Sequence, residues 1–356
     1  MTIRSRLTSY LQLTKPTIML LVLFTGATAL VMEGSMLARP GNFLLVMVGL
    51  YLTGGSANAL NQYFEREIDA RMTRTAKRRP LPMNHLGARE ALWFASIIGA
   101  LGVVLFGVAF NWLTALLSLV TLLFYALFYT LWLKPSTWQN IVIGGAAGAM
   151  APVGAWTAAT GTMAVAPWLL FALVFLWTPP HFWALAMICK DDYVKANLPM
   201  LPVVKGETET IRQILWYTVA LIAVSLGLAF VGAQWIYVIV AIGLGALLMS
   251  KVIDAWRLRT MVSYRTLFGY SIIYLFGLFS AIIVDNLLLA YHRAEAYRRE
   301  ATLARIRIDH LNQQLADAYG KLVAVNSDLT VAERLLSAVA QPATLADGLS
   351  DLPLDR

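Results

Sequence analysis

The stretch from Asn61 to Pro82, NQYFEREIDARMTRTAKRRPLP, is the segment around which the rest of the chain is organised. Asn61, Glu65 and Asp69 are spaced i, i+4 and i+8, so a helix would place them on one face, about 12 Å from first to last. A basic segment follows them, and its prolines would end any helix. Its cationic side chains are Arg66, Arg71, Arg74, Lys77, Arg78 and Arg79.

Oxygen ligands on one helix face suit a hard cation such as Mg²⁺, and basic side chains nearby suit the phosphates that such a cation bridges. The alternative is a helix end at a membrane surface that carries ordinary positive charge. This alternative accounts for the arginines, but it does not explain two carboxylates and an amide aligned at the same end. The segment therefore predicts a site for Mg²⁺ and phosphate.

Composition places the chain among polytopic membrane proteins. Of its 356 residues, 59% are hydrophobic and 13% are charged, which is too apolar for a soluble domain of this length. The first apolar run lacks a small-residue cleavage site, so we expect a retained span rather than a signal peptide. The single cysteine, Cys189, excludes an intrachain disulfide.

The apolar runs are continuous rather than alternating, so we expect them to cross the bilayer as helices. They predict an all-α membrane bundle of nine spans. The expected spans are residues 17–34, 43–63, 90–110, 112–133, 139–160, 167–189, 214–232, 234–252 and 267–289.

The distribution of charge predicts the orientation of the bundle. Residues 1–290 carry 20 Lys and Arg against 11 Asp and Glu, whereas residues 291–356 carry 8 against 9. All but one of the 20 cations fall in segments on one side, and Arg39 is the exception. We therefore expect a bacterial inner-membrane protein with a cytoplasmic N-terminus and an external C-terminus. The net charge of +8 thus reflects membrane orientation rather than nucleic-acid binding.

A second cytoplasmic loop resembles the first in its layout. The segment 181–209, HFWALAMICKDDYVKANLPMLPVVKGETE, also runs from a span end through acidic residues to basic residues and prolines. We interpret the two as a weak internal repeat, and pseudo-symmetric halves commonly place a site at their interface. Between them, the small-residue segment 135–156 predicts either tight helix packing or a substrate passage.

The C-terminal part is a different kind of sequence. Apolar residues recur every seven positions from Ala301 to Leu336, with a second apolar row from Ala304 to Val339, which is a coiled-coil pattern. Thr330 and Glu333 have the spacing of a capping box, which predicts a helix break at 326–328. We therefore expect a membrane domain over 1–290, an amphipathic helix over 291–341 and a disordered tail over 342–356. The helix is expected to pair with another copy or with a partner protein outside the membrane.

Carboxylates at a bundle mouth, arginines beside them and an apolar interior suit a diphosphate head on a long apolar tail. Metal ions at the carboxylates would stabilise the leaving diphosphate as Lewis acids, while basic and phenolic groups would hold its oxygens. The expected Mg²⁺ ligands and catalytic residues are Asn61, Glu65, Asp69, Asp191 and Asp192. The expected diphosphate-binding residues are Arg66, Arg74, Arg78, Tyr193 and Lys195.

The same motifs resemble a known family. The acidic segment at 61–82 is similar to the first motif of the intramembrane prenyltransferase (UbiA) superfamily. The segments 10–19, 129–156 and 176–206, including TPPHFW and PMLPVV, resemble its protoheme IX farnesyltransferase family over residues 10 to about 290. This resemblance implies a nine-helix bundle, farnesyl diphosphate and protoheme IX as substrates, and transfer of the farnesyl group to a heme vinyl with addition of water.

Two positions depart from the superfamily pattern. Glu65 stands where Asp is usual, and Lys195 stands where a second Asp would follow Asp191, which weakens the expected metal coordination on that side. His181, beside Pro179 and Pro180 within a span, is costly at that depth. We interpret it either as a heme-iron ligand or as a histidine bonded to a freed backbone carbonyl.

Three other functions compete with heme farnesylation. A prenyltransferase of a quinone or chlorophyll pathway would share the fold but not the TPPHFW segment. A transporter of a phosphorylated lipid or ion could place carboxylates at the midplane, whereas these cluster at one interface. An assembly factor for a heme–copper oxidase, without enzyme activity, would not need the acidic site, although the C-terminal helix could bind such an oxidase in an enzyme as well.

Overall fold

The structure is a computed structural model that describes residues 3–340. Over these residues it holds nine helical segments long and apolar enough to cross a membrane and no strand, which confirms the predicted all-α membrane bundle. The helices are α1 (Ile3–Leu13), α2 (Pro16–Glu33), η1 (Ser35–Ala38), α3 (Pro40–Phe64), α4 (Arg66–Arg71), α5 (Thr73–Ala76), α6 (Ala88–Ala109), α7 (Trp112–Leu123), η2 (Phe124–Leu133), α8 (Lys134–Ser136), α9 (Asn140–Ala149), α10 (Ala151–Thr160), α11 (Val165–Ile188), α12 (Lys190–Lys195), α13 (Leu201–Val204), α14 (Gly206–Gly227), η3 (Leu228–Val231), α15 (Trp235–Leu258) and α16 (Met261–Val339).

The last three spans are longer than predicted at their basic ends. The seventh begins at Gly206 instead of residue 214, and the expected loop around Lys251–Arg265 is helical except for Arg259 and Thr260. Polar side chains extend these helices because they pair along them, as Glu209 does with Arg212. The Thr260 hydroxyl also accepts the backbone N–H of Ser263 at 3.2 Å and so helps to begin α16.

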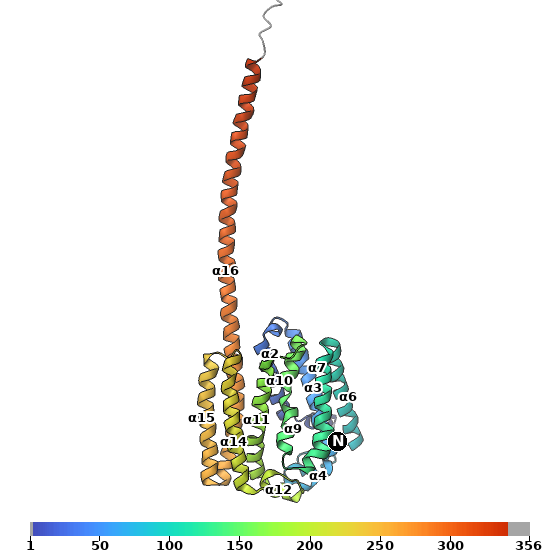
Figure 1. Cartoon of the computed structure of the whole chain (residues 1–356). Helices are drawn as coiled ribbons and strands as arrows, with labels where there is room; N and C mark the ends of the chain where they lie inside the picture. Colours follow the sequence, from blue (N-terminus) through green and yellow to red (C-terminus); the bar gives the residue numbers. More distant parts are fainter. Residues whose placement is uncertain (1–2, 341–356) are drawn as a thin grey trace, which may run out of the picture. The chain divides into compact units, whose positions relative to one another are not determined.

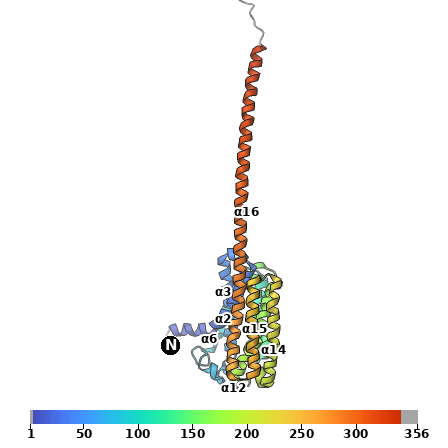
Figure 2. The ribbon, with the colours of Figure 1, turned by 90° about the vertical axis from the view of Figure 1, so that its left-hand side faces the viewer.

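The spans pack side by side around a large apolar core, and a second, smaller cluster joins α1, α3 and α6 (Figure 1). In one half, α3 packs against α6 and α2, and α2 packs against α10. In the other, α11 packs against α9, α10 and α14, and α14 packs against α15. The short α1 runs across the direction of the spans (Figure 2), as an amphipathic helix does at a membrane surface.

Small residues of α9 permit close helix contacts. A side chain at Gly144 would overlap the ring of Tyr129, and one at Gly145 would lie 3.0 Å from Thr178. At these two positions the small residues therefore serve tight packing, not a passage. The ring of Tyr129 lies on η2, which is a π-helical segment and not the α-helix that the apolar run predicts.

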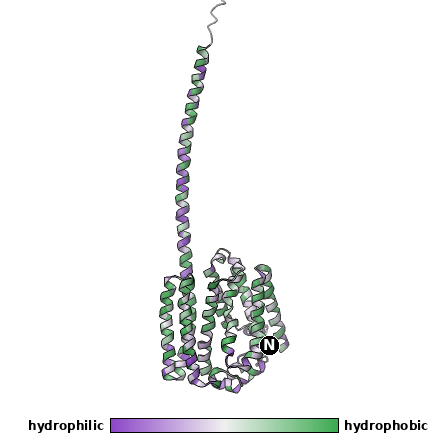
Figure 3. Cartoon of the chain, in the orientation of Figure 1, coloured by the Kyte–Doolittle hydropathy of each residue, from purple (hydrophilic) through white to green (hydrophobic). Residues whose placement is uncertain are grey.

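The two acidic loops have the same construction and meet at one end of the bundle. Each membrane span, α3 or α11, is followed at once by a six-residue helix, α4 or α12. The carboxylate of Asp192 on α12 accepts the backbone N–H of Arg74 on α5 at 3.1 Å. Hydrophilic residues gather at this end (Figure 3).

Contacts divide the chain into two units at Ala290 and Tyr291. The described part of the second unit is helical to Val339, and its heptad side chains, from Ala301 to Val339, are exposed. The helix runs without interruption through residues 326–328, so the predicted break there is wrong, because neither Asn nor Ser nor Asp prevents helical backbone bonding. The predicted disordered tail, 342–356, lies outside the described residues.

Candidate active site

The aligned oxygen donors lie where α3 gives way to α4. Glu65 is the single residue between the two helices, yet its N–H donates to the carbonyl of Asn61 at 3.0 Å. The N–H of Asp69 donates in turn to the carbonyl of Glu65 at 2.8 Å. This unbroken spacing keeps the three side chains on one face, and each is only 2% exposed. The face points into the protein and not into water.

Three cations surround this face, and together the six residues form what we call the charge cluster: Asn61, Glu65, Asp69, Lys15, Arg79 and Lys134. Lys134 forms a short ion pair with Glu65, and Arg79 forms one with Asp69. Arg79 also lies 3.6 Å from the second oxygen of Glu65, so one guanidinium bridges both carboxylates. The ammonium of Lys15 donates to the side-chain oxygen of Asn61 at 2.7 Å.

These three cations were not among the predicted phosphate-binding residues. Lys15 and Lys134 come from segments far from Asn61 in sequence, and only the folded chain brings them together. A local signal exists, since each lysine stands directly before a proline at the edge of a span. Lys15 adopts a left-handed backbone with φ of 52°, which turns the chain sharply between α1 and α2.

Burial and neighbouring charges set the ionisation of the cluster. Burial opposes the charge on Glu65, but Lys134 and Lys15 outweigh it and hold its pKa below the usual value. Burial raises the pKa of Asp69, because Arg79 only partly offsets burial and the nearby charge of Glu65. Burial and the charge of Arg79 lower the pKa of Lys15 to about 7.

The second acidic loop contributes a separate group beside the first loop. Burial works against ionisation of Asp192, but hydrogen bonds from Thr73 and from the backbone of Arg74 outweigh it and lower its pKa. Tyr193 is buried, and burial raises its pKa. Asp191 and Lys195 are exposed on α12. The structure thus brings Asp192 and Tyr193 toward the first loop and leaves the other two at the surface.

The three predicted phosphate-binding arginines are not members of the charge cluster. Arg66 lies over the ring of Tyr63, 5.0 Å from its centroid, and donates to the Tyr63 carbonyl at 2.9 Å. Arg74 meets the second loop through its backbone, and the side chains of Arg74 and Arg78 are exposed. Of the basic segment after Asp69, Arg79 is the residue that reaches the buried carboxylates.

His181 lies on α11, which continues as a helix through Pro179 and Pro180. Its ring is stacked between Trp177 and Phe268, with centroids 4.2 Å and 4.5 Å away. Its Nδ1 lies 2.7 Å from the hydroxyl of Ser271 on α16. The alternative partner considered from sequence, a backbone carbonyl freed by the prolines, is therefore not the one that Nδ1 contacts.

The donor set of the charge cluster fits Mg²⁺. Among residues 3–340, no three His, Cys, Asp or Glu side chains gather into a metal group. However, proteins commonly hold Mg²⁺ with one or two carboxylates and complete its shell with waters and substrate phosphates. Glu65 and Asp69 supply two carboxylates, and Asn61 adds an amide oxygen. Their charges are balanced here by the side chains of Lys134 and Arg79, at positions that a bound cation would take over.

The fold and this charge cluster agree with a family assignment. The model of the UbiA prenyltransferase family matches residues 21–279, so the chain belongs to that family and is a prenyltransferase. It is an integral membrane protein.

Among curated proteins, the chain is similar to one named protoheme IX farnesyltransferase from Rhodopseudomonas palustris (strain BisB5). The two are 46% identical over 292 residues, which cover 78% of this chain and 89% of that protein.

Solved structures share the fold at low identity. A structure of digeranylgeranylglyceryl phosphate synthase is 19% identical with a TM-score of 0.65, and the match covers 79% of this chain and 98% of that one. A UbiA homolog from Archaeoglobus fulgidus bound to DMAPP and Mg²⁺ is 16% identical with a TM-score of 0.56, covering 76% and 99%.

Proposed function

We propose that the chain transfers a farnesyl group from farnesyl diphosphate to a vinyl group of protoheme IX and so makes heme O. The C–O bond of the diphosphate breaks and its electron pair leaves with the diphosphate. The allylic carbon then bonds to the terminal vinyl carbon, and water adds to the adjacent carbon with loss of a proton. The products are heme O, diphosphate and a proton, so the step needs no oxidant or reductant.

The observation that carries this proposal is the buried charge cluster in a chain 46% identical to a protoheme IX farnesyltransferase. The cluster contains the charges that a departing diphosphate requires, and it lies at the end of an apolar bundle suited to a farnesyl tail. Preorganised cations in a site with little water stabilise developing negative charge better than exposed ones. We therefore assign the main contacts with the diphosphate to Lys134, Arg79 and Lys15.

Asn61, Glu65 and Asp69 would hold Mg²⁺, as the Archaeoglobus fulgidus homolog binds that ion together with DMAPP. The ion would supply Lewis-acid stabilisation of the leaving diphosphate. Lys134 and Arg79 would release the carboxylates and contact phosphate oxygens instead. Asp192 holds the two loops together by its bond to the backbone of Arg74, which keeps the predicted ligands of the second loop beside the first.

His181 is the residue that we assign to heme iron. The hydroxyl of Ser271 donates its one proton to the carbonyl of Phe268 at 2.6 Å. It therefore accepts at its contact with His181, so Nδ1 of the imidazole carries the proton and donates. Nε2 then keeps its lone pair, which is the form of imidazole that binds iron. Ser271 thus orients the ring as an iron ligand would need.

The charge asymmetry of the loops supports a bacterial inner-membrane location with a cytoplasmic N-terminus and an external C-terminus. We keep residues 1–290 as the catalytic domain of the proposal. The heptad side chains of residues 301–339 form an apolar stripe that supports pairing with another copy or with an oxidase partner.

The test uses the full chain purified in detergent, with hemin under reduction, farnesyl diphosphate and Mg²⁺. Mass spectrometry should detect heme O, and a coupled assay should detect one diphosphate for each heme O formed. Matched reactions contain EDTA, or an aromatic acid such as 4-hydroxybenzoate in place of heme. Prenylation of the aromatic acid and not of heme would overturn the assigned acceptor, while leaving the prenyltransferase class intact.

A further inference from the structure

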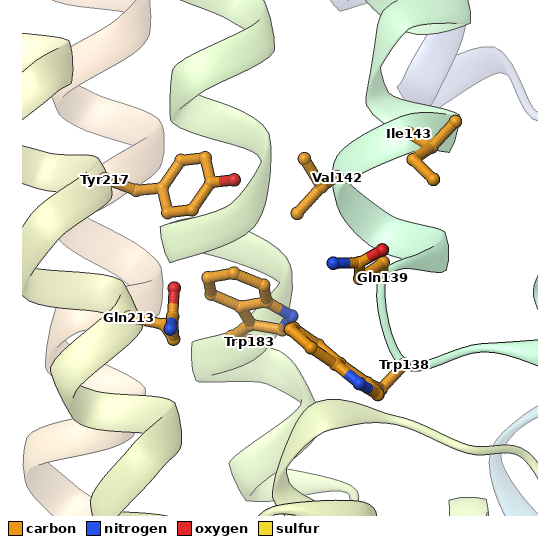
Figure 4. A pocket seen from close by; sticks show the side chains of 7 residues that line it. All are labelled: Trp138, Gln139, Val142, Ile143, Trp183, Gln213 and Tyr217. Atoms are coloured by element: carbon orange, nitrogen blue, oxygen red, sulfur yellow. The ribbon is translucent and has the colours of Figure 1, made fainter.

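A cavity of about 360 Å³ lies between α9, α11 and α14, and the seven residues that line it are all different from those of the charge cluster (Figure 4). Its walls carry three aromatic rings, two side-chain amides and two aliphatic residues, and none of the seven is charged. The aromatic and amide residues are Trp138, Gln139, Trp183, Gln213 and Tyr217. The cavity thus differs from the charge cluster in both charge and chemistry.

The cavity lies at one end of the membrane spans, because Trp183 and Gln213 belong to spans whereas Trp138 and Gln139 precede α9. Trp183 lies five residues before the end of α11 at Ile188, which is about 8 Å along the helix axis. Gln213 lies seven residues after the start of α14 at Gly206, or about 10 Å. The cavity therefore lies at the depth where the head group of a molecule dissolved in the bilayer would be found.

Trp183 carries a hydrogen-bond donor that has no acceptor. Its side chain is fully buried, and within the described residues its Nε1–H has no partner. Figure 4 shows this nitrogen on the side of the indole turned toward Gln139 and Trp138. An indole N–H can only donate, and a buried donor without an acceptor is unfavourable. The cavity therefore presents a donor to whatever molecule occupies it.

Gln213 offers the complementary group. Its Nε2 donates to the carboxylate of Glu209 at 2.8 Å, and that carboxylate is held by Arg212 at 2.6 Å. Because an ionised carboxylate only accepts, this bond fixes the orientation of the amide. The carbonyl oxygen of Gln213 is then the atom left to accept a hydrogen bond at the cavity wall.

We propose that this cavity binds an uncharged ring from the bilayer that carries carbonyl or hydroxyl oxygens, such as a quinone or hydroquinone head group. The rings of Trp183 and Tyr217 are nearly perpendicular, at 85° with centroids 5.4 Å apart, and with Trp138 they provide apolar walls for a planar molecule. An ionised diphosphate is excluded because no cation lines the cavity. A dianionic tetrapyrrole is excluded for the same reason, and the volume lies at the small end of ligand sites.

The proposal is tested by titrating duroquinone and its hydroquinone into the full-length protein in detergent, with empty micelles as the background. Trp183→Phe removes the N–H and keeps an aromatic ring, so it should weaken quinone binding about three- to tenfold, the effect of one hydrogen bond. Trp216→Phe is the matched control, because Trp216 is 63% exposed on the same helix as Tyr217, and it should bind like wild type. Gln213→Met should weaken hydroquinone binding more than quinone binding.

Thermal unfolding shows whether each variant is folded. If Trp183→Phe does not fold, Gln213→Met alone tests the proposal, because Gln213 is partly exposed. No saturable binding of either form would mean that the cavity holds water only, which overturns the proposal. The proposal would also be overturned if Trp216→Phe lost as much binding as Trp183→Phe. It would be overturned as well if the protein bound dioleoylglycerol in a Trp183-dependent way and did not bind the ring compounds. Because the readout is ring binding in the absence of heme and farnesyl diphosphate, it does not depend on the proposed reaction.

Discussion

Removing the ammonium of Lys134 tests whether the charge cluster is a buried, mutually dependent set of charges. Glu65 is 2% exposed, and Lys134→Met would leave it with Arg79 at 3.6 Å as its nearest remaining cation. Breaking one partner of a buried ion pair costs about 3–5 kcal/mol, and the remaining guanidinium places our expectation at the low end, about 3 kcal/mol of unfolding free energy. Arg6→Met is the matched control, because the 2.5 Å pair of Arg6 with Glu90 is about half exposed and should contribute at most about 1 kcal/mol.

The assay is denaturant unfolding of the purified chain in detergent with EDTA, so that no divalent cation masks the carboxylates. In the wild type the pKa of Glu65 is depressed, so its stabilising contribution is present above the ordinary value of 4.5 and is lost as the pH falls through the folded pKa. In Lys134→Met burial should raise that pKa. The difference in stability between the two proteins should therefore shrink as the pH is lowered from neutral toward 4.5.

A double variant separates this interaction from general damage to the fold. Glu65→Gln combined with Lys134→Met removes both charges, so it should be more stable than the sum of the two single changes predicts. Two results would refute the reasoning. One is a Lys134→Met effect no larger than that of Arg6→Met, and the other is additivity of the two changes within about 0.5 kcal/mol.

The remaining predictions concern catalysis, heme and assembly. Asp69→Asn and Asn61→Ala should each abolish farnesyl transfer and Mg²⁺-dependent binding of farnesyl diphosphate while the protein still folds; full turnover at saturating Mg²⁺ would contradict the proposed ligands. His181→Ala should change the Soret band of bound heme. Ser271→Ala should shift the iron–histidine vibration in resonance Raman spectra, and Ser271→Thr should keep it at the wild-type frequency. Unchanged spectra in all three variants would favour a purely structural histidine. Truncation after Tyr291 should lower the oligomeric mass in detergent and spare heme O synthesis; lost activity at unchanged mass would assign the C-terminal helix to the active site instead.

The fold was readable from the sequence because continuous apolar runs leave helices as the form that satisfies their backbone in lipid. The acidic face was readable because Asn61, Glu65 and Asp69 lie within one local helical repeat. The cationic partners of this face could not be predicted from the sequence, because Lys15 and Lys134 reach it from other segments through long-range packing. Local spacing also failed at the start of α14, where polar residues suggested a loop but stabilise about two further helical turns by pairing.

The π-helical segment Phe124–Leu133 has a consequence for how this enzyme tolerates change. Thr130 within it accepts from the amide of Asn61 at 3.1 Å, and Lys134 follows it directly. Inserting or deleting one residue in α7, the α-helix that leads into this segment, would alter the length of the span by only about 1.5 Å, but it would rotate everything beyond by about 100°. Such an event would carry Lys134 away from Glu65. The rotation of this helix about its axis is therefore tightly constrained, and its length is not. For a span that faces only lipid, the length is constrained and the rotation is not.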